Sequence, residues 1–353
     1  MLRLNILKEN IYNVSLEELK SFFISVQEKP FRADQLWNWL YVKGINNLNV
    51  VNNISLPVIK KINENFFFPD FKVKKYICSK DGTKKWLFEL NDGKEIETVY
   101  IPEKNRGTIC ISSQVGCTLS CSFCHTGTMK FIRNLNLSEI LGQIIYVKND
   151  LKDWVYNKEE RKVTNIVFMG MGEPFYNYEN VIKTINVLIN NKGLAFSKRK
   201  VTLSTSGVVP VIDKFKEESD VNLAISLHAA FDKIRDELVP INRKWPINKL
   251  LEALRNYSKR RVNKKITFEY IMLDGVNDSL TDAKELIKLI KPFKAKINLI
   301  PFNPWPGSKY KVSSPDRILE FKKYILEKGK LVATVRMPRG NDVLAACGQL
   351  KSF

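Results

Sequence analysis

The chain has 353 residues, enough for one large domain with a sizeable core and a second, smaller domain. Hydrophobic residues make up 44% and charged residues 27%, an ordinary globular composition, and no apolar run reaches the length of about 18 residues that a membrane-spanning helix needs. The 57 Lys and Arg residues exceed the 37 Asp and Glu residues, and the resulting net charge of +20 favours a polyanion such as nucleic acid over a basic protein without such a partner. Residues 1–7 contain no apolar signal core, so we expect a cytoplasmic protein.

Residues 1–75 predict a small helical domain, which we expect to be an accessory RNA-binding domain. Ser15 and Glu18 form a capping-box pattern ahead of apolar residues at helical spacing. A second helix is expected around residues 36–40 with an end near Gly44, and a third over residues 55–62. The basic stretch 72–75 would close this domain. The second helix carries an aromatic cluster of Trp37, Trp39 and Tyr41. These side chains could stack on RNA bases or pack in the core of the helical domain.

Residues 76–104 predict a β-hairpin or meander that links the helical domain to the main domain, because residues alternate and turn signals stand at 81–82 and 92–93. From residue 105 to 340, apolar strand-like runs alternate with helical patterns, which predicts an α/β fold with a parallel sheet, right-handed crossovers and a full or partial barrel. Strands are expected at 108–112, 165–169, 200–204, 222–227, 266–272, 296–302 and 331–337, with helices at 138–148, 178–189 and 281–290 among others. Residues 341–353 form a C-terminal tail.

The most informative motif is a CxxxCxxC triplet formed by Cys117, Cys121 and Cys124. Thiolates are the usual ligands of iron-sulfur clusters, and three of them can bind a cubane cluster while leaving one iron open for a small molecule such as S-adenosylmethionine (SAM). Two alternatives remain at this point. One is a disulfide with a spare thiol, and the other is a zinc site that uses His125 as the fourth ligand.

Polar residues follow several of the expected strands, at the barrel end where reactive residues normally lie. Glu173 in the Gly-rich turn 170–174 could hold an ammonium group. Hydroxyl groups at 204–206 and the imidazole of His228 could bind a ribose or a carboxylate, or could cap a neighbouring helix. The loop 301–307 is rigid and carries the amide of Asn303.

Together with the run 112–117 and the tail 339–350, these motifs closely resemble the radical SAM methyltransferases that modify adenosine in ribosomal RNA, above all the bacterial branch that methylates adenine C2 in 23S rRNA and in tRNA. The resemblance covers nearly the whole chain. It implies a partial (β/α)6 TIM-like radical SAM barrel, a 4Fe-4S cluster on Cys117, Cys121 and Cys124, and two SAM molecules per turnover. It implies methylation at the peptidyl transferase centre and in the tRNA anticodon loop. It also implies SAM contacts from Gly172, Glu173, Ser204, Ser226, Leu227, His228 and Asn303.

Adenine C2 has no lone pair and is electron-poor, so it cannot attack the SAM methyl group as an ordinary nucleophile. The resemblance implies that the Cys347 thiolate takes a methyl group from one SAM, and that a radical made from a second SAM activates this group and links it to the RNA. Cys110 would then free Cys347 by forming a disulfide with it. Either Glu97 or Cys110 would accept the C2 proton.

Two other functions remain open. The sister activity, which methylates adenine C8 and gives antibiotic resistance, would use the same cysteines, and a non-catalytic zinc-containing RNA-binding protein is the third hypothesis. We expect RNA contacts from the basic runs 197–200 and 259–265 and from Arg336 and Arg339. We further expect that the protein is a monomer and has no membrane partner. We expect a flavodoxin or ferredoxin system to supply its electrons.

Overall fold

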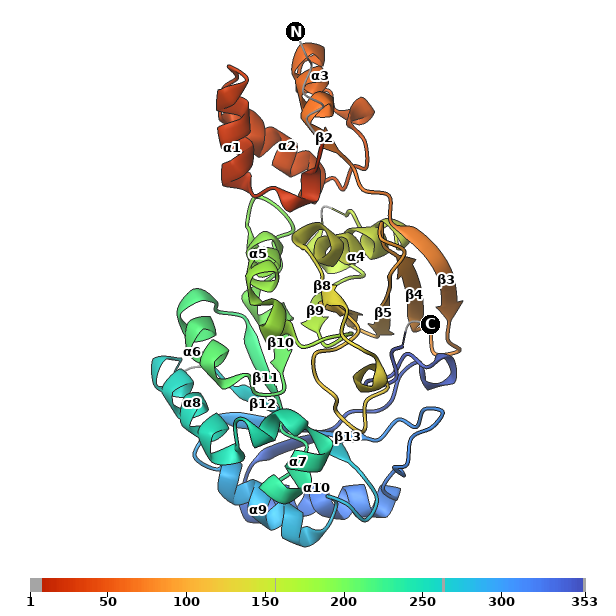
Figure 1. Cartoon of the computed structure of the whole chain (residues 1–353), viewed down its shortest axis with the longest axis vertical. Helices are drawn as coiled ribbons and strands as arrows, with labels where there is room; N and C mark the ends of the chain where they lie inside the picture. The colour runs from red at the N-terminus through yellow and green to blue at the C-terminus, as the bar shows by residue number, and fades with distance from the viewer. Residues whose placement is uncertain (1–7, 156, 262–263, 352–353) are drawn as a thin grey trace.

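The computed structural model describes residues 8–155, 157–261 and 264–351 (Figure 1). The expectation about a signal segment concerns residues 1–7, which lie outside the described residues. In the described part of the chain, no helix combines the length and the apolar character needed to cross a bilayer.

A bundle of three helices lies at one end of the molecule and consists of α1 (Leu16–Ser25), α2 (Phe31–Tyr41) and α3 (Leu56–Asn65) (Figure 1). The short strands β1 (Glu9–Asn10) and β2 (Phe66–Phe67) pair in parallel and close it. The predicted capping box at the start of α1 is confirmed, since Ser15 N donates to Glu18 Oε2 (2.7 Å) and Glu18 N donates to Ser15 Oγ (3.2 Å).

The aromatic cluster of α2 lies mainly in the core of this bundle. Trp37 and Tyr41 are buried, with ring centroids 4.4 Å apart, so the packing interpretation applies to both. Trp39 is half-buried, and the ammonium group of Lys43 lies 4.7 Å from the centre of its ring.

The main body contains a ten-stranded sheet with the order β14-β13-β12-β11-β10-β9-β6-β5-β4-β3. Its parallel part runs in chain order and consists of β6 (Arg106–Cys110), β9 (Asn165–Phe168), β10 (Val201–Thr205), β11 (Asn222–Ser226), β12 (Ile266–Met272), β13 (Ala295–Pro301) and β14 (Val332–Val335). These strands match the predicted ones to within two residues at either end. The reason is that buried parallel strands form continuous apolar runs, which are visible in a single segment of sequence.

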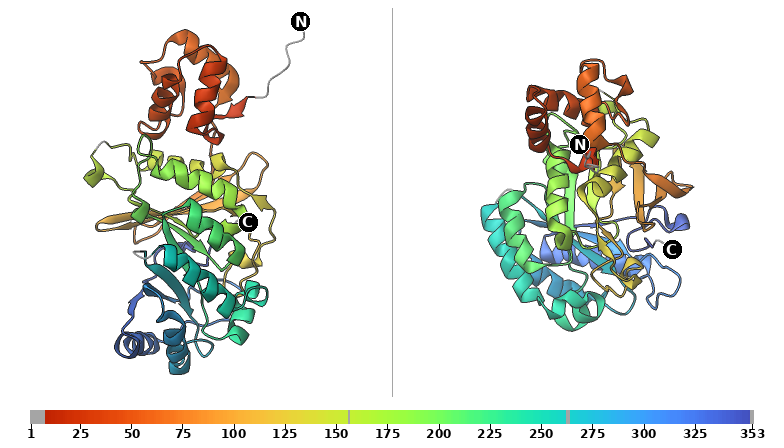
Figure 2. Two further views of the ribbon diagram at one scale, coloured as in Figure 1. Left: turned by 90° about the vertical axis from the view of Figure 1, so that its left-hand side faces the viewer. Right: turned by 45° about the horizontal axis from the view of Figure 1, so that its top comes forward.

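Helices connect successive parallel strands and cover the outside of the sheet (Figure 2). They are α4 (Leu137–Asp150), α5 (Tyr178–Ile189), α6 (Val209–Glu218), α7 (Asp232–Leu238), α8 (Ile247–Arg260), α9 (Leu280–Ile290) and α10 (Pro315–Gly329). This alternation is a partial (β/α)6 barrel with one further strand, as the sequence predicts.

The predicted meander exists, but it extends the barrel sheet instead of forming a separate link. It consists of β3 (Lys72–Cys78), β4 (Lys84–Glu89) and β5 (Glu95–Glu103), all antiparallel to their neighbours, and β5 pairs with β6. The basic stretch 72–75 therefore belongs to a strand and does not end the helical region, because its backbone pairs with β4. The domain limits proposed from the sequence stay a prediction.

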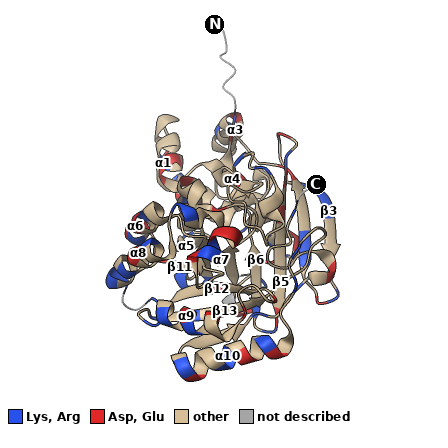
Figure 3. Cartoon of the chain, turned by 60° about the horizontal axis from the view of Figure 1, so that its bottom comes forward, with Lys and Arg blue, Asp and Glu red and all other residues tan. Residues whose placement is uncertain are grey.

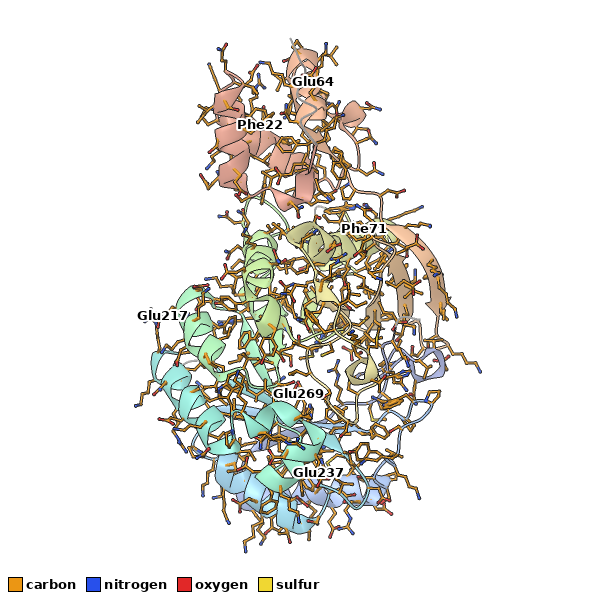
Figure 4. The ribbon with its side chains drawn as sticks, viewed as in Figure 1. Phe22, Glu64, Phe71, Glu217, Glu237 and Glu269 are labelled. Atoms are coloured by element: carbon orange, nitrogen blue, oxygen red, sulfur yellow. The ribbon has the colours of Figure 1, made fainter. Side chains whose placement is uncertain are left out.

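The segment between α3 and β3 docks on α4 through Phe71 (Figure 4). A Cβ atom at Gly142 of α4 would lie only 1.7 Å from Phe71 Cζ, so the aromatic ring needs a glycine beneath it. Asn13 also accepts a hydrogen bond from Ser138 N at the start of α4 (2.8 Å). These contacts fix the helical bundle against the barrel.

Candidate active site

The three cysteines lie on a loop that a short β-ladder closes at its base. β7 (Gln114–Val115) pairs antiparallel with β8 (Arg133–Asn134), and residues 116–132 form the loop between them. Gly116 has φ +75°, and a Cβ atom there would lie 2.1 Å from the carbonyl oxygen of Lys130. Only glycine therefore allows the chain to turn into the loop immediately before Cys117.

Cys117, Cys121 and Cys124 line one cavity of about 150 Å³, which we call the cysteine pocket. The pocket also contains Cys347 from the tail. Leu119 N donates to Cys117 Sγ (3.3 Å), and burial nevertheless raises the pKa of the Cys117 thiol to about 12. Buried thiols of this kind ionise readily only when a metal centre compensates the charge.

The cysteine pocket fits a cluster better than a single metal ion. In a cubane cluster each cysteine binds a different iron, so the three sulfur atoms need not meet at one point. Among the described residues, no group of three or more His, Cys, Asp or Glu side chains is placed to hold one ion. The zinc alternative also needs His125, but this ring stacks on Trp305 with centroids 4.6 Å apart and does not line the pocket.

Most of the predicted SAM-binding residues line the same pocket, namely Gly172, Glu173, Ser204, Ser226 and His228. The Glu173 carboxylate is fixed by Ser206 N (2.8 Å to Oε2) and Phe175 N (3.0 Å to Oε1), and burial raises its pKa. A buried carboxylate with backbone donors on one side can bind an ammonium group on the other.

His228 is buried and accepts a hydrogen bond at Nδ1 from Ile271 N (3.1 Å). Burial lowers the pKa of its imidazole to about 3, so the ring is neutral at physiological pH. Leu227 is fully buried behind the pocket. Asn303 also lies outside the lining, and its Nδ2 donates to the carbonyl oxygen of Cys347 (3.0 Å).

The tail that carries Cys347 is held on both sides of this residue. Before it, Lys85 Nζ donates to Leu344 O (3.1 Å). After it, His125 N donates to Gly348 O (2.7 Å) and Thr126 Oγ1 donates to Leu350 O (2.5 Å). The loop that carries the three cysteines thus fixes the tail, and Cys347 is half-buried at the wall of the cysteine pocket.

Cys110, near the end of β6, is buried, and its pKa is raised to about 12 by burial and by the neighbouring Cys347 thiol. Cys110 pairs in register with Val167 of β9, and Val167 lines one cavity together with Cys347, so the fold brings the regions of the two cysteines together although they stand far apart in the sequence. All six cysteines of the chain are free, so the predicted pairing of Cys110 with Cys347 is not formed here.

Glu97 on β5 does not reach the cysteine pocket. Lys85 Nζ lies 2.9 Å from its Oε1, and Lys351 N donates to its Oε2 (2.8 Å). Burial raises the pKa of this carboxyl, and the Lys85 ammonium group opposes the rise. In the structure Glu97 anchors the end of the tail.

Sequence reasoning missed Arg235, a fully buried residue of α7 that holds two strand ends. Its guanidinium donates to the carbonyl oxygens of Leu227 (2.9 Å), Ser206 (2.7 Å) and Ser226 (3.2 Å). No local signal distinguishes this residue, because an Arg in a short charged helix normally faces water.

The basic runs proposed for RNA contact are partly neutralised. Lys198 Nζ lies 2.9 Å from Asp220 Oδ2, and Arg261 also pairs with Asp220. Residues 262–263 of the second run lie outside the described residues. Lys and Arg positions also occur along α8, α9 and α10 (Figure 3).

An α/β barrel with a three-cysteine loop at the C-terminal ends of its strands defines a radical SAM enzyme. Comparison with known proteins agrees. Residues 111–290 match the model of the radical SAM superfamily, and residues 9–67 match that of the ribosomal RNA large subunit methyltransferase N-terminal domain. A crystal structure of a radical SAM methyltransferase from Sphaerobacter thermophilus has a TM-score of 0.89 and 37% identity, covering 97% of this chain and 98% of that one.

Two curated relatives narrow the assignment. The dual-specificity RNA methyltransferase RlmN of Gluconobacter oxydans is 47% identical over 98% of this chain and 86% of its own length. RlmN of Rhodospirillum rubrum is 50% identical over 97% of this chain and 80% of its own length. The chain belongs to the RlmN family of dual-specificity RNA methyltransferases.

Proposed function

We propose that this protein methylates C2 of one adenosine in 23S rRNA, at the peptidyl transferase centre, and C2 of an adenosine in the tRNA anticodon loop. The observation that carries the proposal is the position of Cys347 at the wall of the cysteine pocket, on a tail fixed on both sides. A thiol in that position can take a methyl group from a molecule bound beside the cysteines. The two curated relatives are dual-specificity RNA methyltransferases, which supports RNA as the substrate.

In this proposal Cys117, Cys121 and Cys124 hold a 4Fe-4S cluster, and Glu173, with the polar strand ends, holds SAM. The bound cluster supplies one-electron reduction of SAM, with electrons from a flavodoxin or ferredoxin system. Leu227 and Asn303 do not line the cysteine pocket. Leu227 is buried between the lining residues Ser226 and His228, and Asn303 fixes the Cys347 backbone.

The remaining roles fall to Cys347, Cys110 and Glu97. Cys347 accepts the methyl group as a thiolate. One hydrogen atom is then removed from this group by the radical made from the second SAM, and the remaining CH2 joins the Cys347 sulfur to adenine C2, with loss of the C2 proton and of one electron to the redox system. The Cys110 thiolate then attacks the Cys347 sulfur: an S–S bond forms, the electron pair of the S–C bond stays on the CH2 carbon, and this carbon takes up a proton to become the methyl group of the product. Glu97 or Cys110 accepts the C2 proton, and the raised pKa of each group makes its deprotonated form a strong base.

We further propose that the N-terminal helical bundle contacts the RNA, and that the protein works as a monomer in the cytoplasm with its RNA substrates. The match of residues 9–67 to an rRNA methyltransferase N-terminal domain supports the first point. A structured RNA must present one adenine outside its stack for any such enzyme to reach C2.

The test is nucleoside mass spectrometry of unmethylated rRNA and tRNA after anaerobic incubation with reconstituted protein, reductant and SAM. We expect 2-methyladenosine in both RNAs. 8-Methyladenosine would overturn the C2 assignment, and an intact cluster with no product from either RNA would overturn the proposed function.

Two cysteine variants test the proposed roles separately. Cys347→Ala should abolish methylation and RNA adduct formation while iron and sulfide content stay normal. Cys110→Ala should trap RNA covalently on Cys347, which denaturing electrophoresis detects as a protein–RNA adduct. Free methylated RNA in normal yield from Cys110→Ala would contradict its role.

A further inference from the structure

A second cavity meets the cysteine pocket at Cys347. It has a volume of about 440 Å³ and occupies the interior of the barrel, so we call it the barrel cavity. The two cavities share a wall that consists of Met169, Glu269, Ile300, Arg336 and Cys347. The three cluster cysteines line only the first cavity. Cys347 therefore borders both cavities, as transfer between two large substrates requires.

The barrel cavity is polar where a TIM barrel is normally packed with branched apolar side chains. Its lining includes Thr108, Thr202, Thr267, Lys296, Asn298 and Thr334 from the strands, and Arg106 and Arg339 at its rim. Its volume lies within the range of about 300–1,000 Å³ that is usual for ligand pockets. It is open to the side because β6 pairs with β5 and not with β14, so the sheet does not close.

Glu269 of β12 is the exceptional side chain in the shared wall. It is 4% exposed and lies in the interior, close to the barrel strands (Figure 4). Thr334 Oγ1 donates to Asn298 Oδ1 (2.8 Å), and Asn298 Nδ2 donates to Glu269 Oε1 (2.9 Å). Oε2 is buried and has no hydrogen-bond partner among the described residues. A buried acceptor without a partner destabilises the structure, so a ligand that donates to it is expected.

The neighbouring groups define what that ligand offers. Arg336 lies in the same wall with Nη1 3.8 Å from Met169 Sδ, and its other guanidinium N–H groups have no acceptor in the described part of the chain. Asn303 Oδ1, also buried in the barrel cavity, is a second acceptor without a described partner. Free acceptors beside a free donor fit an adenine, whose amino group donates and whose ring nitrogens accept.

We propose that the barrel cavity receives the target adenine of the RNA and that Glu269 Oε2 accepts a hydrogen bond from its 6-amino group. This inference rests on the proposed function. SAM also carries a 6-aminopurine, so the chemistry alone allows two sources. The RNA base is favoured because Asn298 and Thr334, which fix the carboxylate, line only the barrel cavity. Glu269 is thus a residue that determines base specificity.

The experiment uses reconstituted holoenzyme and a tRNA whose methylated adenosine has been located by mass spectrometry. That adenosine is replaced by purine riboside, which lacks the 6-amino group, and both RNAs are compared by equilibrium binding and by methylation. The wild-type protein should prefer adenosine by roughly 10- to 100-fold, as expected when a buried acceptor is left without its donor in the purine riboside complex. Glu269→Gln should reduce this preference to below about threefold, because its amide places N–H groups where Oε2 was.

Glu103→Gln is the matched control. Glu103 lines the rim of the same cavity, 3.8 Å from Arg106, and its substitution changes the net charge equally. It should keep the preference for adenosine. Thr334→Val, at an exposed position, removes only the far end of the hydrogen-bond chain and should reduce the preference partly, even if Glu269→Gln fails to fold.

Three results would overturn the inference. An unchanged preference in Glu269→Gln and Thr334→Val would show that the carboxylate does not contact the base. A loss of SAM affinity in equilibrium dialysis, with the preference intact, would assign Glu269 to SAM. An equal loss of preference in Glu103→Gln would show a general charge effect. Absence of methylated product from the wild-type protein would instead refute the proposed function, so the two failures are distinguishable.

Discussion

Replacing Lys85 with Met should destabilise the protein and release the tail that carries Cys347. Lys85 Nζ lies 2.9 Å from Glu97 Oε1, with side chains 11% and 3% exposed, and Coulomb's law gives about 6 kcal/mol for unit charges at this distance and an effective dielectric constant of about 20. Desolvation offsets part of this attraction, and removing one partner of a buried pair costs about 3–5 kcal/mol. The hydrogen bond to Leu344 O is lost as well.

The penalty should depend on pH. Burial already raises the folded-state pKa of Glu97, so ionisation of this group favours the unfolded state. The protonated Glu97 carboxyl therefore contributes its full stabilisation when the pH is below the pKa that Glu97 has in the unfolded chain. This stabilisation is lost as the pH rises through the pKa that Glu97 has in the folded protein. Without Lys85 the pKa of Glu97 in the folded protein rises further. The electrostatic cost of the Lys85→Met substitution is therefore absent at a pH below the Glu97 pKa of the folded wild-type protein. It is complete at a pH above the Glu97 pKa of the folded variant.

The assay is denaturant unfolding at pH 5 and pH 7.5, combined with the rate of Cys347 alkylation as a measure of tail release. Lys84→Met is the control, since Lys84 pairs with Asp150 at 3.2 Å in a more exposed setting and should cost at most about 1 kcal/mol. Lys85→Met with a free energy of unfolding within about 1 kcal/mol of wild type at pH 7.5 would refute the reasoning.

Three further results are expected. Arg235→Met should lower the free energy of unfolding by about 2–4 kcal/mol, because three buried carbonyl groups lose their donor. It should also weaken SAM binding in equilibrium dialysis, and unchanged SAM affinity would contradict the role of Arg235 at the strand ends. Gly116→Ala should give a native circular dichroism spectrum but poor iron loading, since the loop cannot turn beside Lys130. Normal iron content in this variant would show that the turn does not require glycine. Because the pKa of Cys110 is about 12, the thiolate fraction of this residue at pH 8 should be roughly 10⁻⁴. Cys110 should therefore react with iodoacetamide far more slowly than the exposed Cys78, and equal rates would show that Cys110 is not buried.

Features set by local pattern were predictable from the sequence. The limits of α5 and β12 agree with the predicted segments 178–189 and 266–272, because the apolar periodicity of each lies within a single stretch. The cysteine triplet and the polar strand ends were equally visible, since parallel strands bring their carboxyl ends to one edge of the sheet.

Features that depend on distant pairing were not predictable. The meander joins the barrel sheet through the pairing of Val99 with Cys110, and no local pattern specifies this register. The contacts of Lys85 and Glu97 with the tail join residues that stand more than 250 positions apart. Glu269 offered a usable signal, as the one charged residue in the otherwise apolar or uncharged strand β12.

The open sheet has a consequence for the behaviour of the protein in solution. A sheet that does not close has a free edge, and free edges invite pairing with a second molecule and aggregation. At one edge lies β3 (Figure 3), whose exposed residues include Lys72, Lys74 and Lys75. Its pairing with β4 shifts register between Val73 and Lys75. Positive charge and an irregular backbone both hinder the docking of another strand. The basic stretch 72–75 therefore protects the molecule against self-association at this edge of the sheet.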